Sequence, residues 1–201
     1  MRLGILGGTF DPVHYGHLLL ADSAREQCRL DQVWLLPAAT PPHKQGHELS
    51  SVEQRIEMLE LAVAGSPAML VSRLEADRGG VTYTVDTLAA LAAEDANRQL
   101  FFLMGADSLA DLPNWRQPER ICQLAIVAVV RRAGQEIDYS RLADFVPAER
   151  LELFREHQVE MPLVELSSHE IRDRVGRGQS IRYRTPRAVE KYIESQELYR
   201  K

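Results

Sequence analysis

Residues 7–17 read GGTFDPVHYGH, and this stretch decides the fold. It follows the apolar run Leu3–Leu6 and precedes a run of helix-compatible residues, 18–28. The order is therefore strand, glycine turn, two histidines and helix. A glycine turn at this point lets backbone N–H groups approach a phosphate closely, at the positive end of a helix dipole. His14 and His17 add two imidazoles at the same end, so we interpret the stretch as a site for polyphosphate chemistry.

Apolar runs alternate with helical patterns along the chain. Short, nearly continuous apolar runs fit parallel strands buried on both faces. The predicted strands are Leu3–Leu6, Val33–Leu36, Met69–Ser72, Leu100–Met104 and Ala125–Val130. The predicted helices are Gly16–Cys28, Val52–Ala64, Val85–Glu94, Pro118–Cys122 and a closing helix, Pro186–Ser195. This alternation predicts an α/β fold, a Rossmann-like, doubly wound parallel sheet with a C-terminal helical segment, whose ligands bind beyond the carboxyl ends of the strands.

The composition narrows the class of protein. The chain has 201 residues, of which 45% are hydrophobic and 26% charged, so we expect one globular domain over residues 1–201. Its net charge of -5 argues against nonspecific binding to nucleic acid. No apolar run reaches the roughly 18 residues of a membrane span, and no long apolar stretch opens the chain as in a signal peptide. Cys28 and Cys122 lack metal-ligand spacing, so we expect free buried thiols in the cytoplasm.

A second candidate anion site lies far along the chain. Residues 167–172 read SSHEIR, which predicts a helix N-terminus with a capping box from Ser167 to Glu170. Free N–H groups, two hydroxyls and Arg172 at one helix start also suit an anion. The same residues therefore predict both a cap and a phosphate contact.

Three loop segments follow predicted strands at the same edge of the sheet. Residues 41–44, PPHK, form a proline-stiffened basic loop, which is either an ordinary surface loop or a clamp for a second anion. Residues 82–84, TYT, start a helix and present N–H groups suited to a carboxylate. Trp115 lies in a polar, proline-bearing loop and is a candidate to stack on a ligand ring.

The opening stretch resembles the signature of the HIGH-type nucleotidyltransferases, with residues 14–17 as the tetrad. The resemblance implies that the turn and tetrad bind the phosphates of a nucleoside triphosphate. His14 and His17 would stabilise charge as pyrophosphate departs, and a side chain at Gly16 would crowd the phosphates. Residues 167–172 resemble the superfamily's second phosphate motif, although His169 stands where threonine is frequent.

All these elements in this order resemble one family, the bacterial nicotinate-nucleotide adenylyltransferases. The resemblance implies a single nucleotidyltransferase domain that transfers AMP from ATP to nicotinate mononucleotide, giving deamido-NAD and pyrophosphate in NAD biosynthesis. The mononucleotide phosphate would attack the α-phosphorus in line, without a covalent intermediate. Mg²⁺ would accompany the ATP phosphates without a dedicated protein cage, and the protein would be a monomer or a homodimer.

The resemblance also implies residue roles. The catalytic residues would be His14, His17 and Arg172. The ATP site would comprise Gly7, Gly8, Thr9, Phe10, His14, His17, Gly105, Asp107, Ser167, Ser168 and Arg172. The nicotinate mononucleotide site would comprise His43, Lys44, Thr82, Tyr83, Thr84, Asp107, Trp115 and Arg132. In it, the threonine segment would hold the carboxylate largely by main chain, Trp115 would stack on the pyridine ring, and Asp107 would bind a ribose hydroxyl.

Three alternatives remain open at this point. The first is another adenylyl- or cytidylyltransferase with the same opening motif, acting on phosphopantetheine or an alcohol phosphate. The second is a zinc site built from His14, His17, His43 and His47, whose spacings are plausible for a metal. The third is a noncatalytic nucleotide sensor that kept the fold.

Overall fold

The computed structural model describes residues 1–40, 49–132 and 136–200. Within these residues, six strands form one parallel sheet in the order β3-β2-β1-β4-β5-β6. The strands are β1 (Arg2–Gly8), β2 (Gln32–Pro37), β3 (Met69–Val71), β4 (Gln99–Gly105), β5 (Ile126–Arg132) and β6 (Val159–Met161). The strand order reverses between β1 and β4, which is the topological switch point of a Rossmann-like sheet. The predicted fold class is confirmed.

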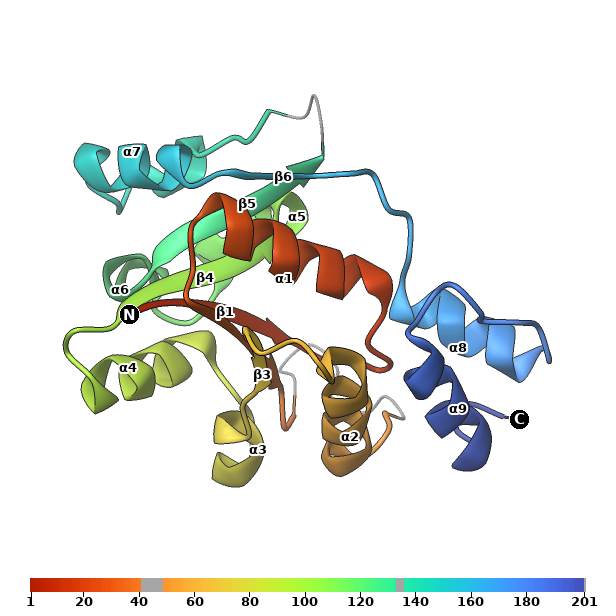
Figure 1. Cartoon of the computed structure of the whole chain (residues 1–201). Helices are drawn as coiled ribbons and strands as arrows, with labels where there is room; N and C mark the ends of the chain where they lie inside the picture. The colour runs from red at the N-terminus through yellow and green to blue at the C-terminus, as the bar shows by residue number, and fades with distance from the viewer. Residues whose placement is uncertain (41–48, 133–135, 201) are drawn as a thin grey trace.

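The two central strands carry the core. Leu3 of β1 pairs with Leu100 of β4, and Ile5 pairs with Phe102. These four side chains are at most 5% exposed. Helices cover both faces of the sheet, with α1 (Tyr15–Gln27) over one face and α4 (Thr84–Glu94) on the other (Figure 1). Because both faces are covered, the strands are apolar at successive positions and do not alternate.

The remaining helices connect the strands or follow the sheet. They are α2 (Val52–Val63), α3 (Leu74–Arg78), α5 (Ala106–Asp111), α6 (Pro118–Leu124), α7 (Ala148–Glu156), α8 (Ser168–Gly176) and α9 (Arg187–Ser195), with 3₁₀ turns at Leu112–Asn114 and Ser140–Leu142. Ser51 caps α2, since its hydroxyl accepts from the Gln54 N–H at 3.2 Å and the Gln54 side chain accepts from the Ser51 N–H at 3.0 Å. Ser167 caps α8 by accepting from the Glu170 N–H at 3.1 Å.

Several elements differ from the sequence prediction. β6 was not predicted, because the charged Glu160 interrupts the apolar residues of this three-residue strand, whereas the equally short β3 is wholly apolar. α3 and α5 span only five and six residues, too few for an amphipathic pattern to be recognised. Ala125, predicted to begin the fifth strand, is the C-cap of α6, and β5 continues to Arg132.

The C-terminal segment returns to the loop that joins β1 to α1. After β6 the chain runs past α1, and α8 and α9 lie beyond the sheet near the start of α1 (Figure 1). The Ser168 hydroxyl donates to the Pro12 carbonyl at 2.9 Å, and the Thr185 hydroxyl donates to the Val13 carbonyl at 2.7 Å. The Tyr15 N–H donates to the Arg184 carbonyl at 3.1 Å. Contacts between distant parts of the chain therefore fix the backbone over residues 12–15.

Both cysteines are buried free thiols, as predicted. Burial raises the pKa of Cys28 to about 11 and that of Cys122 to about 12, so both thiols stay protonated near neutral pH. None of the helices in the described ranges combines the length and the apolar character that crossing a membrane requires.

The Thr185 contact predicts a stability effect. Thr185→Val removes a hydroxyl that is 1% exposed and leaves the Val13 carbonyl without this donor. We expect the free energy of unfolding to fall by about 1–3 kcal/mol, measured by urea denaturation. Ser195→Ala, at an exposed hydroxyl on α9, is the matched control and is expected to stay within about 0.5 kcal/mol of the wild type. Equal stability of Thr185→Val and wild type would contradict the anchoring role.

Candidate active site

The β1–α1 loop and the end of β4 line a cavity at the switch point of the sheet. We call it the histidine cavity; its volume is about 240 Å³. The loop contributes His14, Gly16 and His17, and the β4–α5 junction contributes residues 105–107. The wall is completed by residues that the sequence did not single out, on α1, β5, the end of β6 and the segment after it: Leu20, Val130, Arg131, Met161, Pro162, Val164 and Leu166.

The two predicted histidines stack on each other at the start of α1. Their ring centroids are 3.7 Å apart, with an interplanar angle of 22°. His14 is the N-cap residue, and its backbone N–H donates to Nδ1 of His17 at 3.3 Å. The side chain of His14 is buried, its Nδ1 has no hydrogen-bond partner, and burial lowers its pKa to about 4. His14 is therefore a neutral imidazole near pH 7, and it lines the histidine cavity.

Two further motif residues support the stacked rings. A Cβ atom on Gly16 would lie 3.0 Å from Nδ1 of His14, so glycine lets the ring pack against the helix start. The sequence interpretation attributed this glycine to room for phosphates; within the protein, the close neighbour is the His14 ring. Phe10 has a φ of 52° and is 1% exposed, and its ring meets the His17 ring edge-on at 4.9 Å. Its side chain supports His17, which leaves only its backbone for the predicted nucleotide contact.

The predicted phosphate motif on α8 reaches the same loop. Arg172 donates to the Asp11 carbonyl at 2.7 Å, next to the bond from Ser168 to Pro12. In this structure both side chains hold the loop backbone. Ser168 and Arg172 therefore lie beside the histidine loop, and Ser167 is the N-cap residue of the same helix. Contacts from these residues to a nucleotide stay a prediction.

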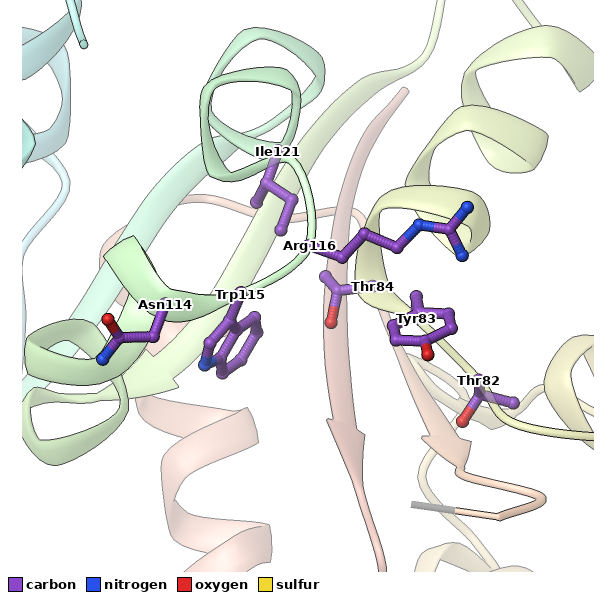
Figure 2. Close-up of a pocket in the computed structure, with 7 residues that line it drawn as sticks. All are labelled: Thr82, Tyr83, Thr84, Asn114, Trp115, Arg116 and Ile121. Carbon is purple, nitrogen blue, oxygen red and sulfur yellow. The ribbon is translucent and has the colours of Figure 1, made fainter. Parts of the chain in front are cut away.

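A second cavity, the tryptophan pocket, lies between the start of α4 and the segment after β4. Its volume is about 200 Å³, and Figure 2 shows its lining: Thr82, Tyr83, Thr84, Asn114, Trp115, Arg116 and Ile121. The Trp115 indole meets Phe102 edge-on at 6.0 Å, and its Nε1 donates to Asp111 at 3.2 Å. Tyr83 is the N-cap residue of α4, so the N–H groups of that helix start lie at the pocket. The structure thus brings together the threonine segment and Trp115, which the sequence placed in one subsite.

One segment of chain lines both cavities. Residues 105–107 line the histidine cavity, and residues 114–116 line the tryptophan pocket. The exposed Asp107 lines the histidine cavity, although the sequence assigned it to both ligands. The turn residues Gly7, Gly8 and Thr9 line neither cavity.

The structure does not describe the side chains of three predicted site residues. His43 and Lys44 lie outside the described residues, as does His47 of the zinc alternative. Arg132 ends β5, and only its backbone is described. Its neighbour Arg131 lines the histidine cavity and pairs with Glu160. No group of three or more metal-ligating side chains assembles in the part of the chain that the structure describes.

The sequence analysis missed a buried network behind the tryptophan pocket. Glu75, Thr82 and Thr87 are 7%, 6% and 2% exposed. The Thr87 hydroxyl donates to Glu75 at 2.8 Å, and the Thr82 hydroxyl also hydrogen-bonds to Glu75. Burial raises the pKa of Glu75, and the two threonine hydroxyls oppose this shift. The carboxylate therefore fixes Thr82, one wall of the pocket, and no local motif signals this contact.

Comparison with known proteins agrees with this geometry. The model of the cytidylyltransferase-like family matches residues 5–174. A probable nicotinate-nucleotide adenylyltransferase of Thermomicrobium roseum is 44% identical over 199 residues, covering 99% of this chain and 92% of the relative. Another, from Roseiflexus sp., is 46% identical over 200 residues, covering 98% of each chain.

The solved structures give the same fold. Nicotinic acid mononucleotide adenylyltransferase of Plasmodium falciparum, complexed with NaAD, superposes with a TM-score of 0.78 at 20% identity, covering 98% of this chain and 97% of that one. Its complex with APC gives 0.76 at 19% identity, covering 98% and 96%. Fold, cavities and family match define a nucleotidyltransferase of the cytidylyltransferase-like class. Within it, the chain belongs to the nicotinate-nucleotide adenylyltransferase family.

The burial of His14 predicts a pH effect on stability. Its pKa is about 4 in the folded protein and about 6.5 in the unfolded chain, so the unfolded chain binds more protons between these values. The free energy of unfolding therefore decreases as the pH falls, by about 2 kcal/mol between about pH 7 and about pH 5. In His14→Gln, we expect the free energy of unfolding, measured in urea, to decrease less over this pH interval than in the wild type.

The control for this effect is His169→Gln, because the His169 side chain is 77% exposed. It is expected to show the same loss of stability on acidification as the wild type. An unchanged acid sensitivity in His14→Gln would show that His14 does not carry the effect.

Proposed function

We propose that this protein transfers AMP from ATP to nicotinate mononucleotide, forming deamido-NAD and pyrophosphate. The observation that carries the proposal is the pair of cavities lined by one segment, residues 105–116, one holding the stacked histidines and the other holding Trp115 beside a helix start. A 5′-phosphate oxygen of the mononucleotide bonds to the α-phosphorus of ATP. The bond from that phosphorus to the oxygen bridging to the β-phosphate breaks, and pyrophosphate leaves.

We assign ATP to the histidine cavity. His14 and His17 lie at the N-terminus of α1, where backbone N–H groups and the helix dipole favour an anion. His14 is buried and neutral, so its imidazole has one N–H to donate, and we assign this donor to the triphosphate. Arg172 and Ser168, already at this loop, add charge and a hydroxyl beside it.

We assign the mononucleotide to the tryptophan pocket. The N–H groups at the start of α4 suit the pyridine carboxylate, and the half-buried Trp115 indole offers a face for the ring. Lys44 and Arg132 are proposed to balance the acceptor phosphate. Catalysis then consists of holding two anions in line and neutralising the charge that develops, since no step needs a protein nucleophile.

Mg²⁺ is proposed to enter with the ATP phosphates. Its ligands would be mainly phosphate oxygens and water. When bound, the ion neutralises phosphate charge. We also propose that residues 1–201 act as one nucleotidyltransferase domain, because the relatives match it over 98–99% of its length.

The reaction is tested by pyrophosphate release from ATP with a panel of acceptors. Nicotinate mononucleotide and nicotinamide mononucleotide are compared side by side, with phosphopantetheine and an alcohol phosphate as the alternatives. We expect the highest kcat/KM with nicotinate mononucleotide. A higher value with phosphopantetheine or the alcohol phosphate would replace the proposed acceptor, and no turnover with any acceptor would favour a nucleotide sensor.

His17→Ala tests the assignment of the histidine cavity. Loss of a group that stabilises transition-state charge is expected to lower kcat by at least about 10²-fold. The measurement is steady-state pyrophosphate release at saturating substrates. Glu149→Ala, at an exposed position on α7 that lines neither cavity, is the control and is expected to keep normal turnover. Near-normal kcat in His17→Ala would remove this residue from the mechanism.

Trp115→Ala tests the assignment of the tryptophan pocket. We expect KM for nicotinate mononucleotide to rise about tenfold, because a stacking surface is lost, while KM for ATP changes little. Trp115→Phe keeps an aromatic face and is expected to recover most of the affinity. Equal effects on both substrates would make Trp115 a structural residue.

A further inference from the structure

We infer that Arg116 is a specificity-determining residue that makes the tryptophan pocket favour a carboxylate acceptor over its neutral amide analogue. The inference rests on the proposed function, because it takes the pyridine carboxylate of the mononucleotide as the group bound in this pocket. Sequence analysis did not single out Arg116, and the residue precedes Gln117, whose backbone is left-handed with a φ of 52°.

Arg116 lines the tryptophan pocket beside Tyr83. It follows Trp115 in the chain, and its side chain extends from that segment to the side of Tyr83 (Figure 2). The guanidinium carbon lies 4.7 Å from the centroid of the Tyr83 ring. The aromatic face therefore supports the cation at the start of α4, where the helix N–H groups also point.

Arg116 brings a positive charge to a pocket whose other described lining residues are neutral. Of the described residues that line it, Arg116 alone carries a formal charge, and the others are neutral: Thr82, Tyr83, Thr84, Asn114, Trp115 and Ile121. Backbone N–H groups donate to the oxygen of an amide as well as to a carboxylate, so they separate the two acceptors only in part. A cation beside the bound group acts on its net charge, which is the property that distinguishes the acid from the amide.

Asp86 does not line the pocket, but its negative charge lies close to the Arg116 guanidinium and offsets part of its positive charge. Its Oδ2 lies 3.7 Å from the Arg116 guanidinium, and the two side chains are 48% and 51% exposed. An ion pair this exposed contributes little stability, so the guanidinium is free to turn toward a ligand carboxylate. At the same time, the Asp86 charge offsets part of the field at the pocket. The two residues therefore make opposite predictions for acceptor preference.

The experiment compares kcat/KM for nicotinate mononucleotide with kcat/KM for nicotinamide mononucleotide in Arg116→Gln and Asp86→Asn. We expect the acid-to-amide ratio to fall about tenfold in Arg116→Gln, through KM for the acid, and to rise about threefold in Asp86→Asn. KM for ATP should stay unchanged in both. Arg120→Gln, an exposed arginine on α6 that does not line the pocket, controls for the loss of one positive charge and keeps the wild-type ratio.

The outcomes separate this inference from the proposed function. An unchanged ratio in Arg116→Gln, or an equal loss with both acceptors, would overturn the role of Arg116 while the wild type still adenylates nicotinate mononucleotide. Wild-type protein that does not use this acceptor would instead overturn the proposed function. Arg116→Lys keeps the charge, so it should keep most of the ratio even if Arg116→Gln unfolds.

Discussion

The guanidinium of Arg55 lies where the loops after β1 and β2 meet the start of α2. The residue is 1% exposed, and it donates to the carbonyls of Ser50, Thr9, Ala38 and Ala39 at 3.1, 3.0, 2.8 and 3.2 Å. Burial lowers its pKa, and the nearby Asp11 carboxylate opposes the shift. A buried cation without such partners costs several kcal/mol, so these carbonyls are held in one arrangement. The carboxyl end of the sheet, where both cavities open, depends on that arrangement.

The β1–α1 loop is held from its other side by the end of the chain. The Ser50 hydroxyl donates to the Tyr199 oxygen at 3.2 Å, and Tyr199 donates to Asp11 at 2.6 Å. Burial is the main reason that the pKa of Tyr199 is raised, so it remains a donor. Together with the bonds from Ser168 and Thr185, this network places His14 at the helix start. The histidine stack is therefore a product of tertiary contacts, and the local sequence alone does not hold it.

The features that could be predicted from the sequence are those that a local pattern of residues encodes. The cores of β1 to β5 were found because buried parallel strands are continuous apolar runs. Residues that line the two cavities were singled out because they follow strand ends, where ligands bind in such sheets. β6 was missed because a charged residue, Glu160, stands between its two apolar residues and leaves no apolar run. The sequence analysis missed Arg55, Glu75 and Arg116 for another reason. Each contacts residues that the fold brings near, and no spacing along the chain reveals these contacts.

The two cavities are built by different kinds of contact. The histidine cavity rests on hydrogen bonds to backbone carbonyls, made by side chains from α2, α8 and the segment near Thr185. The tryptophan pocket rests on side-chain contacts, with Thr82 held by Glu75 and Arg116 lying over Tyr83. A change at residue 116 therefore alters the charge at the tryptophan pocket without reaching the carbonyls that hold the loop of His14. Under the proposed assignment of substrates, this separation would let the histidine cavity keep its geometry while the tryptophan pocket determines which mononucleotide is used.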